Sequence, residues 1–99
     1  MGLERTIPAT KPLAWSMLVQ RLTAIGESPV LRMIDGLPAF PDEIPSDDWK
    51  ELRIGLAGGM VTLRRTPDGY SCVTWGTADP RLQASTEQLV HAIVSLTTA

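Results

Sequence analysis

The stretch KELRIGLAGGMVTLRRTPDGYSCVTWG, residues 50–76, decides the fold expected of this chain. Apolar and polar residues alternate along it in three short runs, a pattern typical of strands with one buried face. Two turn signatures, Gly58-Gly59 and Pro67-Asp68-Gly69, separate the runs. Connections this short join neighbouring strands in antiparallel order. The stretch therefore predicts a three-stranded antiparallel meander.

The length of each turn predicts which residues of the meander face one another. A two-residue turn at Gly58-Gly59 pairs Ile54 with Leu63. A three-residue loop at Pro67–Gly69 pairs Leu63 with Val73. The two registers agree on one apolar face of the sheet. That face is expected to hold Leu52, Ile54, Leu56, Val61, Leu63, Val73 and Trp75, with Val61 opposite Trp75.

Two flanking segments show the three- to four-residue spacing of apolar side chains that is typical of amphipathic helices. The first spans about residues 11–25, with Thr10 as its N-cap and Gly26 as its stop. The second follows Asp79, a suitable N-cap, and spans about residues 80–96. Each helix has an apolar stripe that must be buried, and the sheet offers an apolar face to bury it.

A further apolar run, residues 29–34, suits a strand that ends at Asp35-Gly36 and joins the sheet at an edge. The proline-rich passage after it, residues 37–48, is expected to be a loop held on the core by Phe40 and Ile44. The economical arrangement is one two-layer α+β domain over residues 1–99. It has an antiparallel sheet of three or four strands, the order α-β-β-β-β-α, and both helices packed on one face.

The amino-acid composition and net charge disfavour several classes of function. The chain has 9 basic and 11 acidic residues, a net charge of −2, which argues against a general surface for nucleic acid or anionic membrane. No apolar run approaches the roughly 20 residues that cross a bilayer, and no secretory signal is visible. The single cysteine, Cys72, fits a reducing compartment, so we expect a cytoplasmic protein. No glycine motif for phosphate binding occurs, and no cofactor is expected.

The predicted register places Arg53 directly opposite Arg64 on the sheet face away from the helices. Like charges on neighbouring strands repel by a few tenths of a kcal/mol up to about 1 kcal/mol, so something should offset the pair. Solvent, the acidic loop or Glu51 reaching across can do so. Alternatively, the two guanidinium groups bind an anion or orient a docking partner. The candidate ligand- or partner-binding residues of this face are Arg53, Arg64, Thr62, Thr74 and Tyr70.

Other side chains are weaker candidates for chemistry. Cys72, expected beside the arginines, is either an ordinary strand residue or a thiol with a lowered pKa, and His91 lies on the polar side of the last helix. No nucleophile motif accompanies either, so an enzyme is less expected than a non-catalytic domain. One aromatic, Tyr70, is too little for a nucleic-acid stacking platform. No metal site is expected, since the loop carboxylates lack the spacing of a calcium loop: Asp42, Glu43, Asp47 and Asp48.

Trp15 widens the apolar stripe of the first helix beyond what one sheet face would cover. This surplus favours a small non-catalytic interaction or regulatory module that self-associates, as a homodimer for example, or docks on another protein. The alternative hypothesis is a domain that binds a small anionic ligand, or a minor enzyme, at the arginine-bearing face.

Overall fold

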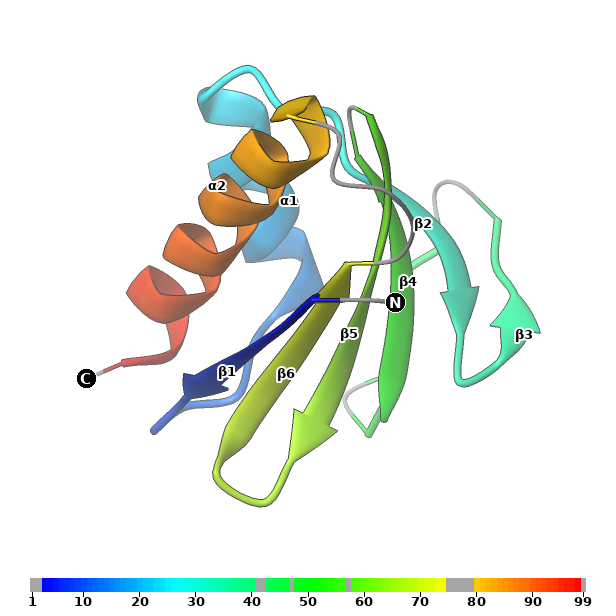
Figure 1. The fold of residues 1–99 in the computed structure, drawn as a ribbon. Coiled ribbons are helices and arrows are strands. Elements are labelled where there is room, and N and C mark those ends of the chain that lie inside the picture. Colours follow the sequence, from blue (N-terminus) through cyan, green and yellow to red (C-terminus); the bar gives the residue numbers. More distant parts are fainter. Residues whose placement is uncertain (1–2, 41–42, 47, 57, 75–79, 99) are drawn as a thin grey trace.

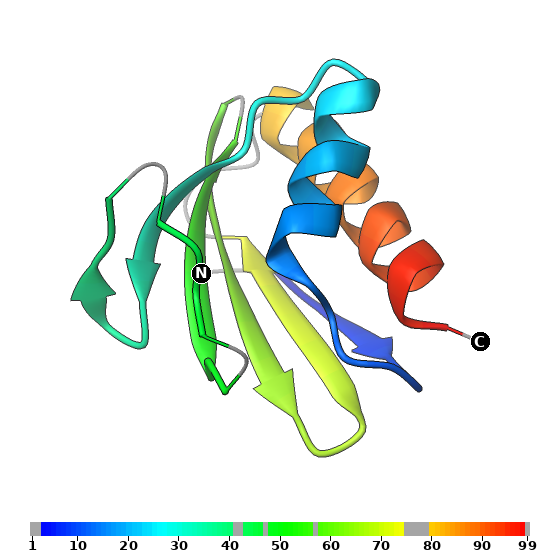
Figure 2. The ribbon, with the colours of Figure 1, turned by 180° about the vertical axis from the view of Figure 1, so that it is seen from behind.

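The computed structural model describes residues 3–40, 43–46, 48–56, 58–74 and 80–98. The strands in this part of the chain form one antiparallel sheet, with the order β1-β6-β5-β4-β2-β3. Both helices lie side by side on the same face of the sheet, as two opposite views show (Figures 1 and 2). The elements are, in chain order, β1 (Leu3–Pro8), α1 (Trp15–Ala24), β2 (Val30–Ile34), β3 (Leu37–Pro38), β4 (Glu51–Leu56), β5 (Gly59–Thr66), β6 (Gly69–Thr74) and α2 (Pro80–Thr97).

The α+β class, the antiparallel sheet and the common face of the two helices are confirmed. The expected strand number and element order are wrong, because β1 precedes α1 and β3 follows β2. β1 pairs with β6 along its whole length and forms one edge of the sheet. The sequence pattern does not predict it, since Ile7 is the one buried residue between Glu4 and Pro8. An edge strand with so little apolar alternation gives no period-2 signal.

α1 begins at Trp15, four residues later than expected, because the preceding residues bind other parts of the molecule. The amides of Thr10 and Lys11 both donate to the carbonyl of Thr97, at 2.8 and 2.9 Å. The Thr10 hydroxyl donates to the same carbonyl, so Thr10 is not the N-cap of α1. These bonds tie the chain between β1 and α1 to the end of α2.

The hairpin of β4 and β5 is shifted by two residues from the predicted register. It closes at the pair Leu56↔Gly59, and Ile54 faces Val61 rather than Leu63. A shift by an even number keeps every side chain on its expected face. The core side of both strands is therefore as predicted, and these side chains are buried: Leu52, Ile54, Leu56, Val61 and Leu63.

The hairpin of β5 and β6 is shifted by a single residue, which reverses the faces of β6. Thr66 pairs with Gly69, so the connection has two residues rather than three. Leu63 then faces Cys72, and Val61 faces Thr74 instead of Trp75, which itself lies outside the described residues. Val73 is correspondingly turned away from the helices.

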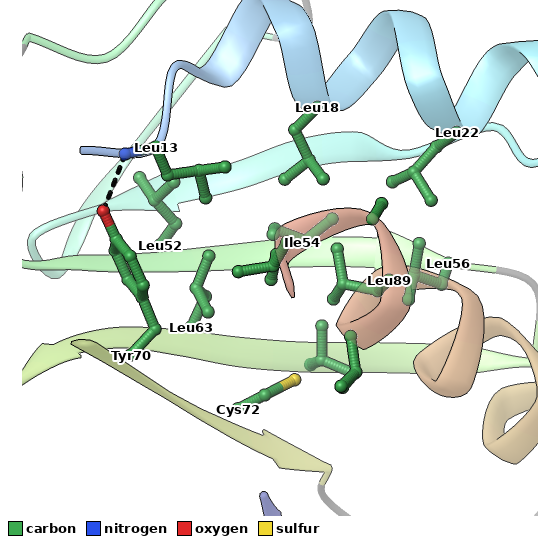
Figure 3. Close-up of a cluster of buried hydrophobic side chains, with 14 of the residues drawn as sticks. Leu13, Leu18, Leu22, Leu52, Ile54, Leu56, Leu63, Tyr70, Cys72 and Leu89 are labelled. Atoms are coloured by element: carbon green, nitrogen blue, oxygen red, sulfur yellow. Dashed lines mark hydrogen bonds between the residues drawn. The ribbon is translucent and has the colours of Figure 1, made fainter. Parts of the chain in front are cut away.

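The reversed strand brings an aromatic side chain into the core (Figure 3). Tyr70 is buried beneath the start of the helical layer, and its hydroxyl accepts a hydrogen bond of 2.8 Å from the amide of Leu13. Trp49 is also buried and stacks on Tyr70, with ring centroids 5.8 Å apart. The guanidinium carbon of Arg65 lies 4.7 Å from the centre of the Trp49 ring. This end of the core is therefore closed by aromatic rings.

The proline-rich passage contains a hairpin rather than only a loop. Asp35 and Gly36 have φ of 52° and 82°, the positive values of a type I′ turn, and they connect β2 to β3. The Asp35 carboxylate accepts the amides of Lys50 and Glu51 at 2.7 and 2.9 Å. The Glu51 amide first, and then that of Lys50, lower the pKa of Asp35. This turn thus fixes where the chain returns to the sheet as β4.

Candidate functional site

The face of the sheet turned away from the helices, the outer face, carries three of the predicted site residues. Arg53, Thr62 and Arg64 reach it from β4 and β5. Tyr70 and Thr74 do not, because the one-residue shift of β6 turns both toward the helices. The prediction that all five residues share a face is wrong for these two.

Arg53 and Arg64 are not opposite each other. Arg64 pairs across the strands with Glu51, and its Nε donates to Glu51 Oε2 at 2.9 Å. Arg53 instead faces Thr62. The expected repulsion therefore does not arise. Glu51, one of the groups expected to offset the charge, neutralises Arg64 directly.

Two guanidinium groups of the outer face, those of Arg32 and Arg53, have no counter-charge among the described residues. The Nε of Arg53 is buried and has no hydrogen-bond partner in the same part of the chain. Arg32, in β2, crosses over Gly55, so that a Cβ on Gly55 would stand 3.0 Å from the Arg32 Nε. Neither guanidinium group makes a hydrogen bond or an ion pair with the part of the chain that the structure describes. Arg53 and Gly55 are two residues apart in β4, so they lie on the same face of the strand. The guanidinium groups of Arg53 and of Arg32, which crosses Gly55, therefore occupy neighbouring positions on the outer face.

A hollow of about 810 Å³ opens on the outer face beside Arg32. Gly55 lies between Val30 and Met60 in the strand ladder, and the Arg32 side chain crosses over it along one side of the hollow. Met33 adds to the apolar lining, and the loop between α1 and β2 contributes Glu27 at the rim. The arrangement joins an apolar surface to a cation that has no ion-pair partner in the described ranges, a combination that suits a ligand with an apolar part and a negative charge.

A second feature is an apolar surface beyond β2. Leu37, Phe40 and Ile44 are 70%, 74% and 73% exposed, and we call them the Leu37–Ile44 patch. Phe40 and Glu43 form a turn in which the Glu43 amide donates to the Phe40 carbonyl at 3.0 Å. The expectation that Phe40 and Ile44 anchor the loop on the core is wrong. Among the described residues of this passage Pro45 is buried, and so is Trp49 directly after it.

The surplus apolar surface predicted around Trp15 is smaller than expected. Trp15 is partly buried and packs against the core. Met17 and Ile25, on and just after α1, are the apolar residues of this region that are about half exposed. Trp15 therefore contributes mainly to packing within the chain.

The other residues considered for catalysis or metal binding do not lie together in the structure. Cys72 is completely buried on the helix side of the sheet, whereas His91 is exposed on α2. Asp48 is exposed, and a hydrogen bond of 2.6 Å from the Ser46 hydroxyl lowers its pKa. Asp42 and Asp47 lie outside the described residues. Among the described residues, no group of three histidine, cysteine or acidic side chains could hold a metal ion.

Burial raises the pKa of the Cys72 thiol from its ordinary value of 9.0 to about 11, although Arg5 lowers it slightly. The suggestion of a reactive thiol with a lowered pKa is therefore wrong. We expect iodoacetamide at neutral pH to modify Cys72 only when the protein unfolds, as measured by mass spectrometry. The unfolded chain loses the thiol proton above pH 9, while the folded chain keeps it until about pH 11. This contribution to stability is thus present below pH 9 and is lost between pH 9 and about pH 11.

The expected loss in the free energy of unfolding between pH 9 and about pH 11 is about 2–3 kcal/mol. Urea denaturation at a series of pH values measures it, and Cys72→Ala is the control, because it removes the thiol and should flatten this part of the profile. Rapid alkylation of the folded protein at neutral pH would contradict the burial of Cys72.

Comparison of the chain with protein-family models, with curated proteins and with solved structures finds no match. No helix in the described ranges has the length and apolar character needed to cross a membrane.

Proposed function

We propose that this chain is a small non-catalytic interaction module of the cytoplasm, and that its partner is a second copy, bound through the Leu37–Ile44 patch. The observation that supports this proposal is the exposure of three large apolar side chains within eight residues of chain. Burying such a side chain stabilises an interface by about 1.5–3 kcal/mol. Large apolar side chains that are exposed together in one short segment mark an interaction surface more often than singly scattered ones do.

The partner does not add a strand to the sheet at β3. The Ala39 amide donates to the Arg32 carbonyl and so points toward the neighbouring strand, β2. Backbone groups alternate in direction along an edge strand, so those of the preceding residue, Pro38, point away from the sheet. Proline has no amide hydrogen to offer a neighbouring strand. The next outward amide, that of Phe40, already donates to the Glu43 carboxylate at 3.2 Å. Contact at this edge therefore depends on side chains.

A second copy is the simplest occupant of such a surface. The three side chains of the patch are uncharged and apolar, so two copies related by a twofold axis can bury them against each other if Glu43, whose carboxylate accepts the Phe40 amide, stays at the edge of the contact. Stable dimers bury about 600 Å² or more on each copy. The three side chains would form the apolar centre of that area, and neighbouring polar residues its rim.

The double variant Phe40→Ser/Ile44→Ser removes two side chains from each copy and should weaken self-association by at least about 100-fold. Sedimentation velocity over a range of micromolar concentrations measures the effect. The matched control, Met17→Ser/Ile25→Ser, removes apolar side chains of similar size from the α1 region and should leave the dimer intact. A wild-type protein that stays monomeric, or a dimer lost only in the control variant, would contradict the proposal.

A further inference from the structure

We propose that the hollow beside Arg32 binds an amphipathic monoanion, a small molecule with one carboxylate and an apolar body. The hollow lies at the Val30 end of β2, whereas the Leu37–Ile44 patch follows the Ile34 end of the same strand. The two surfaces are therefore separate, and this proposal does not depend on self-association.

The volume and lining of the hollow favour an apolar body. Its volume of about 810 Å³ falls within the range of small-molecule sites. Val30, Met33 and Met60 line it, and methionine side chains adapt to irregular apolar ligands. Gly55 leaves room for the Arg32 side chain to cross β4, since a Cβ there would stand 3.0 Å from the Arg32 Nε.

The charge of the site favours a carboxylate. Arg32 lines the hollow and has no carboxylate partner in the described part of the chain. Arg53 lies on the neighbouring outer position of β4, and although its Nε is buried, its positive charge adds to that of Arg32. A guanidinium group binds a carboxylate through two parallel hydrogen bonds, which gives both affinity and orientation.

Glu27 lines the same hollow, and its carboxylate accepts the Ser85 hydroxyl of α2 at 3.1 and 3.2 Å. It adds a negative charge near the site, which disfavours a doubly charged ligand such as phosphate more than a monoanion. A monocarboxylate can turn its charge toward Arg32 and its apolar body toward the methionines.

The test is a titration of ¹⁵N-labelled protein with octanoate, followed by the amide shifts of Val30, Gly55 and Met60. We expect these amides to shift together and to saturate, with octanoate binding about tenfold more tightly than octylammonium or inorganic phosphate. Arg32→Gln should weaken octanoate binding about tenfold. The control Arg21→Gln removes the same charge from α1, where Arg21 donates to Ser95, and should leave binding unchanged.

Gly55→Val displaces the Arg32 side chain from its place over β4 and should weaken octanoate binding at least as much as Arg32→Gln. Valine is favoured in strands, and the one close neighbour of the new Cβ is the flexible side chain of Arg32, so this variant is expected to fold. No saturable shift with octanoate up to about 10 mM would overturn the proposal. So would octylammonium binding of equal strength, or equal losses in Arg32→Gln and Arg21→Gln, since these would show only general attraction.

Discussion

Tyr70→Ala is expected to lower the free energy of unfolding by about 3–5 kcal/mol. The substitution leaves a cavity where a buried ring packs on Trp49, and it leaves the Leu13 amide without its acceptor. Both effects act at the same place, so the expected loss is large for a domain of this size. Urea denaturation followed by circular dichroism measures it.

Two further variants make this result specific. Tyr70→Phe removes only the hydroxyl and should cost about 1–3 kcal/mol, the penalty of an unpaired buried amide. Phe40→Ala removes an aromatic side chain of similar size that is 74% exposed, and it should change stability by less than about 0.5 kcal/mol. If Phe40→Ala proved the more damaging of the two alanine variants, the register of β6 described above would be wrong.

Gly69→Ala is expected to lower the free energy of unfolding by about 3 kcal/mol or more. A Cβ at this position would collide with the backbone of β1, at the Ile7 carbonyl and 2.7 Å from the Ala9 nitrogen. Backbone atoms cannot turn aside as a side chain can, so β1 would have to move away from β6. Thermal unfolding followed by circular dichroism measures the loss, at roughly 4–8 °C for each kcal/mol.

Gly36→Ala is the matched control for that variant. Gly36 also has a positive φ, 82°, but no atom lies within 4 Å of the position of its Cβ. Its expected cost is therefore the backbone strain alone, about 1–2 kcal/mol. Hydrogen exchange should also show lost protection of the Ile7 amide in Gly69→Ala but not in Gly36→Ala. Equal effects of the two substitutions would contradict the close approach of β1 to Gly69.

The parts of the fold that follow from apolar periodicity can be predicted from the sequence. α2 begins and ends within a residue of its expected limits, and the core side of β4 and β5 is as expected. The alternation in those strands is strong enough that a two-residue error in pairing leaves their faces unchanged. The side of the sheet on which a residue lies is thus predicted more reliably than the residue that it faces on the next strand.

The orientation of β6 could not be predicted in the same way, because its sequence is apolar or small on both sides. Tyr70 and Cys72 can face the core as readily as Ser71 and Val73, and only the length of the turn decides between them. Pro67-Asp68-Gly69 is compatible with a two-residue or a three-residue connection. The structure selects the shorter one, in which Gly69 is already paired with Thr66.

The orientation of β6 decides that Tyr70 and Thr74 are not part of the predicted site, whereas the hollow depends on contacts that no local pattern contains. Arg53, Arg64 and Thr62 are on the outer face as predicted, because β4 and β5 keep their faces. The hollow requires the pairing of Val30 with Gly55, two segments separated by the irregular passage. A glycine within a strand is the available signal, since it can mark a place where something approaches the backbone.

The proline at the outer edge of β3 bears on the stoichiometry of any complex. Backbone pairing at a free edge can repeat from chain to chain and grow into fibrils without limit. Side chains that meet across a twofold axis cover each other completely and leave nothing for a third molecule. Pro38 thus favours assemblies at this edge that stop at two.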